Sequence, residues 1–164
     1  MSDEGIEYDL IIQDGPKKVD LSTHIDTEAI REAYNEVRQD TVDIEWLVLK
    51  YDGTRIVCSA KGTTFDKFKE EFGEDERAYG YIRVQMGDEM SKRQKFLLVT
   101  WVGQGVGVIK RAKMSTDKAL VKNILSNFAV ELQIENKSDF DLNFFKEQLN
   151  RAGGANYGTG VRDL

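Results

Sequence analysis

The spacing of apolar residues changes several times along the chain, and each spacing predicts one kind of element. Early in the patterned region, apolar residues recur every three or four positions, which predicts a helix with one buried face. They are Ile30, Ala33, Tyr34 and Val37. Asp26 stands where the N-cap of this helix is expected, and Glu28 suits the positive end of its first turn.

Residues 43–62 predict a β-hairpin, because two runs rich in strand-forming residues flank Asp52-Gly53, a pair favoured by tight turns with positive φ. Helical spacing returns directly after the hairpin. Thr63 or Thr64 is expected to cap this second helix, and Gly73 to end it. Its predicted buried face consists of Phe65, Phe68 and Phe72.

Two more strands are predicted at residues 77–86 and 95–102, joined through Gly87-Asp88. The second is continuously apolar from Phe96 to Val99, as expected for an interior strand covered on both faces. A glycine-rich stretch, residues 103–108, then reads as a flexible connector.

The longest helix is predicted at residues 115–132, and a short fifth strand at 132–135. The residues of this helix expected to face inward are Leu120, Ile124, Leu125, Phe128 and Leu132. A last helix is expected to start at Ser138, with Asp141 as its capping-box partner, and to end at Gly153-Gly154. It is expected to bury Leu142, Phe145 and Leu149.

The predicted order of elements is that of an α/β (α+β) domain with a mixed five-stranded sheet. Helices on both faces of the sheet would bury all the apolar faces, and the long helix would cross over to a parallel strand. A length of 164 residues fits one domain. We expect that domain at residues 25–154, after a mobile extension at 1–24 and before a flexible tail at 155–164.

Composition narrows the class of protein. No run of about 18 apolar residues exists, so no stable membrane insertion is expected. The acidic N-terminal stretch lacks the order of a secretory signal, and the single cysteine, Cys58, fits a reducing compartment, so we expect a cytoplasmic protein. The formal net charge of −6 argues against nucleic-acid binding.

The charge is unevenly distributed along the chain. Between residues 90 and 122, eight Lys or Arg stand against one acid, Asp117, a local formal charge of +7 that leaves −13 for the rest. Such a split favours a basic surface that steers the molecule onto an acidic partner. The alternative is a chance cluster on a solvated face.

Residues for catalysis or metal binding are scarce. One histidine, His24, and one cysteine, Cys58, are too few for the usual zinc sites, and their sequence separation argues against a nucleophilic pair. The stretch 103–108 matches no phosphate-binding loop, and the acidic pairs at 70–71 and 74–76 read as solvated charge. We therefore expect a binding protein without a cofactor, and not an enzyme.

The basic residues fall into two groups. Lys92, Arg93 and Lys95 flank the start of the fourth predicted strand, and we call them the hairpin cations. The second group, the helix cations, are Lys110, Arg111, Lys113, Lys118 and Lys122. The first three of these are expected just before the N-terminus of the long helix, where a cation costs about 0.3–1 kcal/mol. Met114 is expected to be an exposed, adaptable contact among them.

Several long segments, in order, resemble the coactosins, a branch of the ADF/cofilin-homology family. The segments are IDTEAIREAYNEVRQD, WLVLKYDGTRIV, GDEMSKRQKFLLVTWVG, RAKMSTDKALVKNILSNFA and AGGANY, and the resemblance covers about residues 25 to 157. The family fold, a mixed five-stranded sheet between helices, agrees with the order predicted above.

The resemblance implies a monomer that binds the sides of actin filaments, with little monomer binding or severing. Actin is acidic, so both groups of cations and Met114 would form the docking surface. It also implies, more weakly, a lipoxygenase partner contacted through Arg151, just before AGGANY. The regulatory serine of cofilins has no counterpart here, since Ser2 lies far ahead of the first helix. An alternative from another class is an adaptor or phosphoinositide-binding module that uses the same cations.

Overall fold

A computed structural model describes residues 22–39, 41–87, 90 and 92–158, with side chains as far as Gly153. Six strands form one sheet in the order β1-β3-β2-β4-β5-β6. Their bounds are β1 His24–Ile25, β2 Trp46–Asp52, β3 Arg55–Gly62, β4 Arg77–Met86, β5 Arg93–Val102 and β6 Val130–Ile134. Five of them were predicted; the sixth is β1, a two-residue strand that pairs in parallel with the outer edge of β3.

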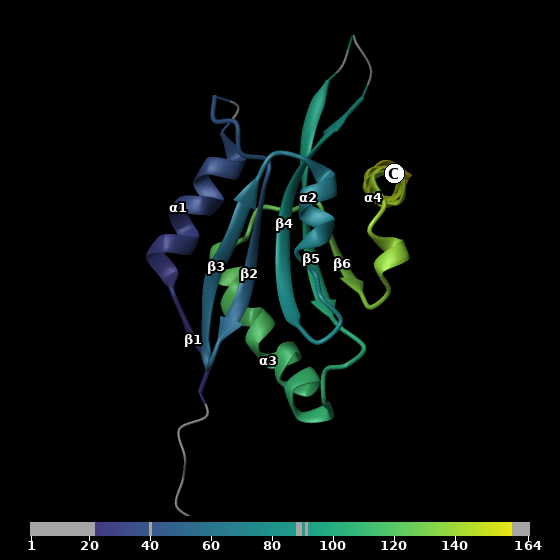
Figure 1. Cartoon of the computed structure of the whole chain (residues 1–164). Helices are drawn as coiled ribbons and strands as arrows, with labels where there is room; N and C mark the ends of the chain where they lie inside the picture. Colours follow the sequence, from purple (N-terminus) through teal and green to yellow (C-terminus); the bar gives the residue numbers. More distant parts are fainter. Residues whose placement is uncertain (1–21, 40, 88–89, 91, 159–164) are drawn as a thin grey trace, which may run out of the picture.

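Four α-helices cover the sheet. Their bounds are α1 Thr27–Arg38, α2 Phe65–Glu70, α3 Val108–Ile124 and α4 Leu142–Gly158, and a short 3₁₀ turn covers Lys137–Asp139. Helices α1 and α3 pack on one face, and α2 and α4 on the other (Figure 1). The prediction of helices on both faces is therefore confirmed.

The sheet topology follows from the length of each connection. The β2–β3 and β4–β5 connections are hairpins with antiparallel pairing, and Gly53 and Gly87 take the positive φ that these turns need. Helix α3 then carries the chain back so that β6 runs parallel to β5. Strand β5 lies between β4 and β6 and is buried from Leu97 onward, as the continuous apolar run predicted.

Four predicted helix boundaries were wrong, both ends of α3 and both ends of α4. Helix α3 begins at Val108, seven residues before the expected start, and ends at Ile124 because the chain must reach β6. Helix α4 begins after Asp141, whose Oδ2 itself accepts from the Phe144 N–H at 3.2 Å, so Ser138 is not its cap. It also continues through Gly153-Gly154 to Gly158, into the range expected to be a tail.

Asp26 occupies the N-cap position of α1 as predicted, but its side chain makes no capping hydrogen bond. Its carboxylate pairs with Arg55 at 3.3 Å, at the start of β3. The buried face of α1 is the predicted one, Ile30, Ala33, Tyr34 and Val37.

Aromatic rings fill the core between the sheet and helices α2 and α4. Phe72 stacks on Phe140 with ring centroids 4.4 Å apart, and Phe68 meets Phe72 edge-on at 5.0 Å. These rings reach the sheet because Gly80 has no side chain. A Cβ at Gly80 would lie 2.7 Å from Phe68 Cζ and 2.9 Å from Phe72 Cζ.

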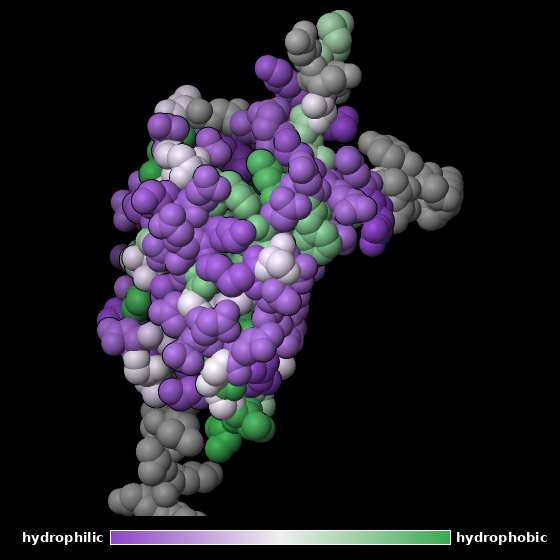
Figure 2. All heavy atoms as spheres, turned by 45° about the vertical axis from the view of Figure 1, so that its right-hand side comes forward, coloured by the Kyte–Doolittle hydropathy of each residue, from purple (hydrophilic) through white to green (hydrophobic). Residues whose placement is uncertain are grey.

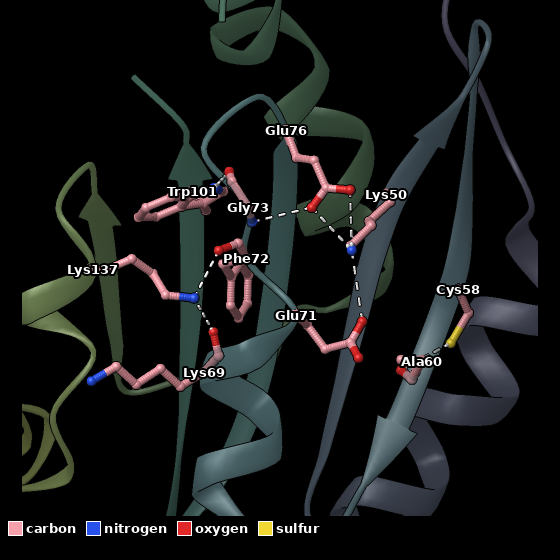
Figure 3. A network of polar contacts seen from close by, with 10 residues as sticks. All are labelled: Lys50, Cys58, Ala60, Lys69, Glu71, Phe72, Gly73, Glu76, Trp101 and Lys137. Atoms are coloured by element: carbon pink, nitrogen blue, oxygen red, sulfur yellow. Dashed lines mark hydrogen bonds and ion pairs between the residues drawn. The ribbon is translucent and has the colours of Figure 1, made fainter. Parts of the chain in front are cut away.

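The turn between α2 and β4 is fixed by polar contacts (Figure 3). Lys137 Nζ donates to two carbonyl oxygens, that of Lys69 in the last turn of α2 and that of Phe72 just beyond the helix. Trp101 Nε1 donates to the Gly73 carbonyl at 2.7 Å. Glu76 bridges the Gly73 N–H and Lys50, so this acid is structural and not merely solvated.

Gly80→Ala should lower the free energy of unfolding by about 1–3 kcal/mol, the usual cost of overpacking a core. The added methyl would force two aromatic rings to move within a packed layer. Chemical denaturation measures the change. Gly107→Ser is the control, because open space surrounds Gly107 and serine is a good N-cap for α3. Equal stability of Gly80→Ala and the wild type would contradict this description of the core.

Candidate functional site

The hairpin cations lie at the start of β5, at one end of the sheet. Lys92 and Arg93 are exposed and Lys95 is half-buried. Because β5 begins at Arg93, alternation places Arg93 and Lys95 on the same face, that of α2 and α4. Lys95 Nζ would lie 3.6 Å from a Cβ on Gly153 in α4. Within the described residues, none of the three forms an ion pair.

Three helix cations lie inside the first two turns of α3, and not before the helix as expected. Arg111 pairs with Glu135 at 3.6 Å and donates to the Gly103 and Val106 carbonyls. It therefore fastens the 103–107 loop to the helix. Lys110 is exposed, and its side chain forms no ion pair with any described residue.

Lys118 and Lys122 share one acid on the edge strand. Their Nζ atoms lie 2.5 and 2.9 Å from the two carboxylate oxygens of Glu131 on β6. Partial burial acts to raise the pKa of Glu131, but the hydrogen bonds and charges of the two lysines outweigh it and lower the pKa. These two cations hold α3 against β6.

A buried acid lies on the side of α3 that faces the sheet. Asp117 is 2% exposed, and its Oδ2 accepts from the Tyr51 hydroxyl at 2.7 Å, while Lys113 lies 3.9 Å from its Oδ1. The Tyr51 and Tyr79 hydroxyls are 3.3 Å apart, and Tyr79 donates to the Met114 carbonyl. The sequence analysis missed this network. The signal that could have revealed it is Asp117, an acid on the apolar side of the helix.

Met114 does not form part of an exposed surface. It is 3% exposed and belongs to the core between α3 and the sheet. With the helix starting at Val108, Met114 shares a face with Asp117, Val121 and Ile124, which all point at the sheet. The prediction of an exposed thioether was therefore wrong.

The large exposed apolar residues of α3 are instead its first two. Val108 and Ile109 are each 82% exposed, and Figure 2 shows hydrophobic atoms gathered at the lower end of the molecule, where α3 begins. The outer face of the helix continues with exposed residues that carry no charge. They are Ala112, Thr116, Ala119 and Asn123.

The eight cations do not form one compact patch. The hairpin cations and the start of α3 stand at opposite ends of β5, which at about 3.3 Å per residue separates them by roughly 30 Å. Arg151 lies on α4, on the other face of the sheet from α3. It is exposed and lies 3.9 Å from Glu147.

The described residues do not form a group of side chains typical of an enzyme active site. They contain no group of three His, Cys, Asp or Glu that could hold a metal ion. Burial raises the pKa of the Cys58 thiol, which keeps it in the weakly nucleophilic neutral form. Among the helices described, none is long and apolar enough to cross a membrane.

Comparison with known proteins places these features in a family. Residues 22–150 match the cofilin/tropomyosin-type actin-binding proteins. The chain is 44% identical to the coactosin-like protein of Bos taurus, over 84% of this chain and 96% of the relative. It is 35% identical to coactosin of Dictyostelium discoideum, over 81% and 93%. The chain belongs to the coactosins.

Solved structures agree with this membership. The crystal structure of human coactosin-like protein superposes with a TM-score of 0.77 at 42% identity, covering 79% of this chain and 99% of that one. Mouse coactosin, described as an actin filament binding protein, superposes with a TM-score of 0.70 at 42% identity, covering 84% and 96%. This coactosin is therefore an actin-binding protein with the ADF-homology fold, and it is not an enzyme.

The tyrosines under α3 predict how stability responds to alkali. Burial raises the pKa of Tyr79 to about 12, and also raises the pKa values of Tyr51 and Tyr81. The folded state thus holds these protons more tightly than the unfolded chain, whose tyrosines ionise near pH 10. The resulting stabilisation is fully present below about pH 10 and is lost as pH rises toward about 12 and beyond.

We expect tyrosinate absorbance to rise in two stages, the second coinciding with loss of circular dichroism. Tyr79→Phe should reduce the amplitude of the second stage, because it removes one late-ionising group. Ionisation of all six tyrosines near pH 10 with the fold intact would contradict the buried network.

Proposed function

We propose that this coactosin binds the sides of actin filaments, with little affinity for monomers and little severing. The observation that carries the proposal is the division of the cations. Arg111, Lys113, Lys118 and Lys122 each have an acidic partner within the molecule, whereas Lys92, Arg93, Lys95 and Lys110 have none among the described residues. Unpaired cations gain most from an acidic partner, because no internal ion pair is lost on binding.

Two separate contacts support side binding. The hairpin cations would provide charge at one end of the sheet, and Lys110 with exposed Val108 and Ile109 would provide charge and apolar area at the other. A span of roughly 30 Å between them suits an extended surface better than a single pocket. Mouse coactosin, with 42% identity, is described as an actin filament binding protein.

The paired helix cations have a supporting role in this proposal. They hold α3 in place and add to the positive potential, which speeds encounter with an acidic filament. Binding should weaken with salt, since charges screen over about 8 Å at physiological ionic strength. Occupancy of the filament side would modulate access of other filament-binding proteins and place the protein in the cytoplasm, on the actin cytoskeleton.

Replacing Lys92, Arg93 and Lys95 by alanine should reduce co-sedimentation with filaments at least about tenfold while leaving the unfolding temperature unchanged. No intramolecular ion pair is lost among the described residues, so only the docking charge is removed. The charge-matched control replaces Arg31, Lys67 and Lys69 by alanine, which changes the net charge equally on α1 and α2 and removes one exposed ion pair, Lys67 with Glu70. Undiminished pelleting of the folded hairpin triple variant would refute this site.

Replacing Val108 and Ile109 by serine should weaken filament binding by about three- to thirtyfold. The salt dependence of the remaining binding should stay almost the same. The change removes exposed apolar area but no charge, so the loss reflects buried contact and not steering. Ala119→Ser, on the outer face of the same helix, is the control for local polarity. If the double variant binds filaments with the affinity of the wild type, the start of α3 is not part of the contact, and the hairpin cations alone carry it.

The same pelleting experiment with vesicles tests the alternative. Phosphoinositide headgroups would also attract the unpaired cations, so an adaptor or lipid-binding role predicts pelleting with vesicles and not with filaments. The lipoxygenase contact stays a prediction that rests on the family resemblance around Arg151. If the two sites are distinct, Arg151→Ala should leave filament pelleting unchanged.

A further inference from the structure

The start of α3 presents apolar area that no described residue covers. Val108 and Ile109 are adjacent and each 82% exposed. Lys110, which follows them, is exposed, and its side chain forms no ion pair with any described residue. Figure 2 shows hydrophobic atoms gathered at this lower end of the molecule. Adjacent exposed apolar side chains beside an unpaired cation are typical of a contact surface.

A cavity of about 250 Å³ connects this surface with the end of the β2–β3 hairpin. Arg77 Cζ lies 3.6 Å from the centre of the Tyr51 ring in its wall, and Arg77 Nη1 donates to the Lys110 carbonyl at 3.3 Å. The charged side chains that line the cavity are Lys50, Asp75, Glu76, Arg77 and Lys110. Because Lys50 pairs with Glu76, two cations without an ion pair to a described residue remain against one acid.

The chain enters the described structure close to this surface. Strand β1 pairs with the start of β3, where His24 lies opposite Arg55, and Arg55 lies opposite Asp52 on β2. Two strand spacings of about 4.8 Å therefore separate β1 from β2, whose Tyr51 lines the cavity. Figure 1 shows β1 and the start of α3 at the same, lower end of the sheet. A segment ahead of residue 22 can reach α3, since ten extended residues span up to about 33–36 Å.

The sequence ahead of residue 22 has the matching chemistry. Residues 1–21 lie outside the described part of the chain and ahead of the family match, which begins at residue 22. Within them, residues 3–14 read DEGIEYDLIIQD, with five acids and no Lys or Arg. Their apolar side chains are Ile6, Tyr8, Leu10, Ile11 and Ile12. Three consecutive apolar residues in an acidic segment are seldom left in water without a function.

We propose that residues 3–14 dock on the start of α3 of the same molecule. The apolar run at residues 10–12 packs against Val108 and Ile109, and the acids lie beside Arg77 and Lys110. The docked segment then competes with the filament for one of the two contacts proposed above. The hairpin cations, at the other end of β5, stay available, so docking weakens filament binding without abolishing it. Only this regulatory consequence rests on the proposed function, because docking itself needs no actin.

Nuclear magnetic resonance of the full chain tests docking without filaments. A nitroxide label on Gln13→Cys, in a Cys58→Ala background that leaves one thiol, should broaden the amide signals of residues 108–110. The label is tethered nearby in any case, so the measured quantity is the loss of broadening when residues 10–12 are replaced by serine. Gly5→Ser with Gly15→Ser is the matched control. It introduces serine into the same segment, removes no apolar side chain and should keep the broadening.

Co-sedimentation tests the regulatory consequence. Replacing residues 10–12 by serine should tighten filament binding about three- to tenfold, because a site that is free in about a tenth to a third of the molecules loses that factor in apparent affinity. The gain should disappear in the Val108→Ser, Ile109→Ser background, where the contact that the segment covers is already removed. The glycine-to-serine control should pellet like the wild type.

The proposal is overturned if the serine variant of residues 10–12 keeps the broadening, or if the broadening lies at the hairpin cations and not at the start of α3. Loss of broadening with unchanged pelleting would support docking and overturn its regulatory role. If no form of the protein pellets with filaments, the proposed filament binding fails, and the label experiment still decides whether the segment docks.

Discussion

The rest of the structure depends on one constraint: ion pairs within the molecule attach α3 to the sheet. The helix has no acid in its first turn and no side-chain N-cap, so its own ends contribute little. Glu131 on β6 and Glu135 just after it supply acids from the sheet side and pair with Arg111, Lys118 and Lys122. Asp117, within α3 itself, lies 3.9 Å from Lys113 and is joined to the sheet by the Tyr51 hydroxyl, which donates to it. The helix therefore stays in place although its sequence is strongly basic.

That constraint also sorts the basic residues by role. A cation already paired within 4 Å of an acid, such as Lys118 or Lys122, gives up an ion pair when it meets a partner, and exposed pairs are worth about 0–1 kcal/mol. An unpaired cation, such as Lys92 or Lys110, loses only its bound water when it meets an acidic partner. Sequence clustering alone cannot separate these roles, because Glu131 and Glu135, which pair with three cations of α3, lie in and just after β6, outside the basic segment.

The pattern of the sequence predicted those parts of the fold whose signals are local. The buried face of α1, the turn at Gly53 and the parallel crossover to β6 all follow from residue spacing, turn chemistry and connection length. The start of α3 does not, since a run of glycines and small apolar residues precedes it and no capping side chain marks it. Hydrogen bonds from Arg111 to the Gly103 and Val106 carbonyls hold the preceding loop against the helix that starts at Val108.

The error at Met114 follows directly from that missed boundary. Read among its cationic neighbours, Met114 looks exposed; placed in a helix that begins at Val108, it shares the buried face with Asp117 and Val121. The same shift turns Val108 and Ile109 from connector residues into the exposed apolar start of a helix. The start of α3 is thus set by tertiary contacts, and it decides which side chains can contact a partner. Sequence periodicity does not reveal those contacts.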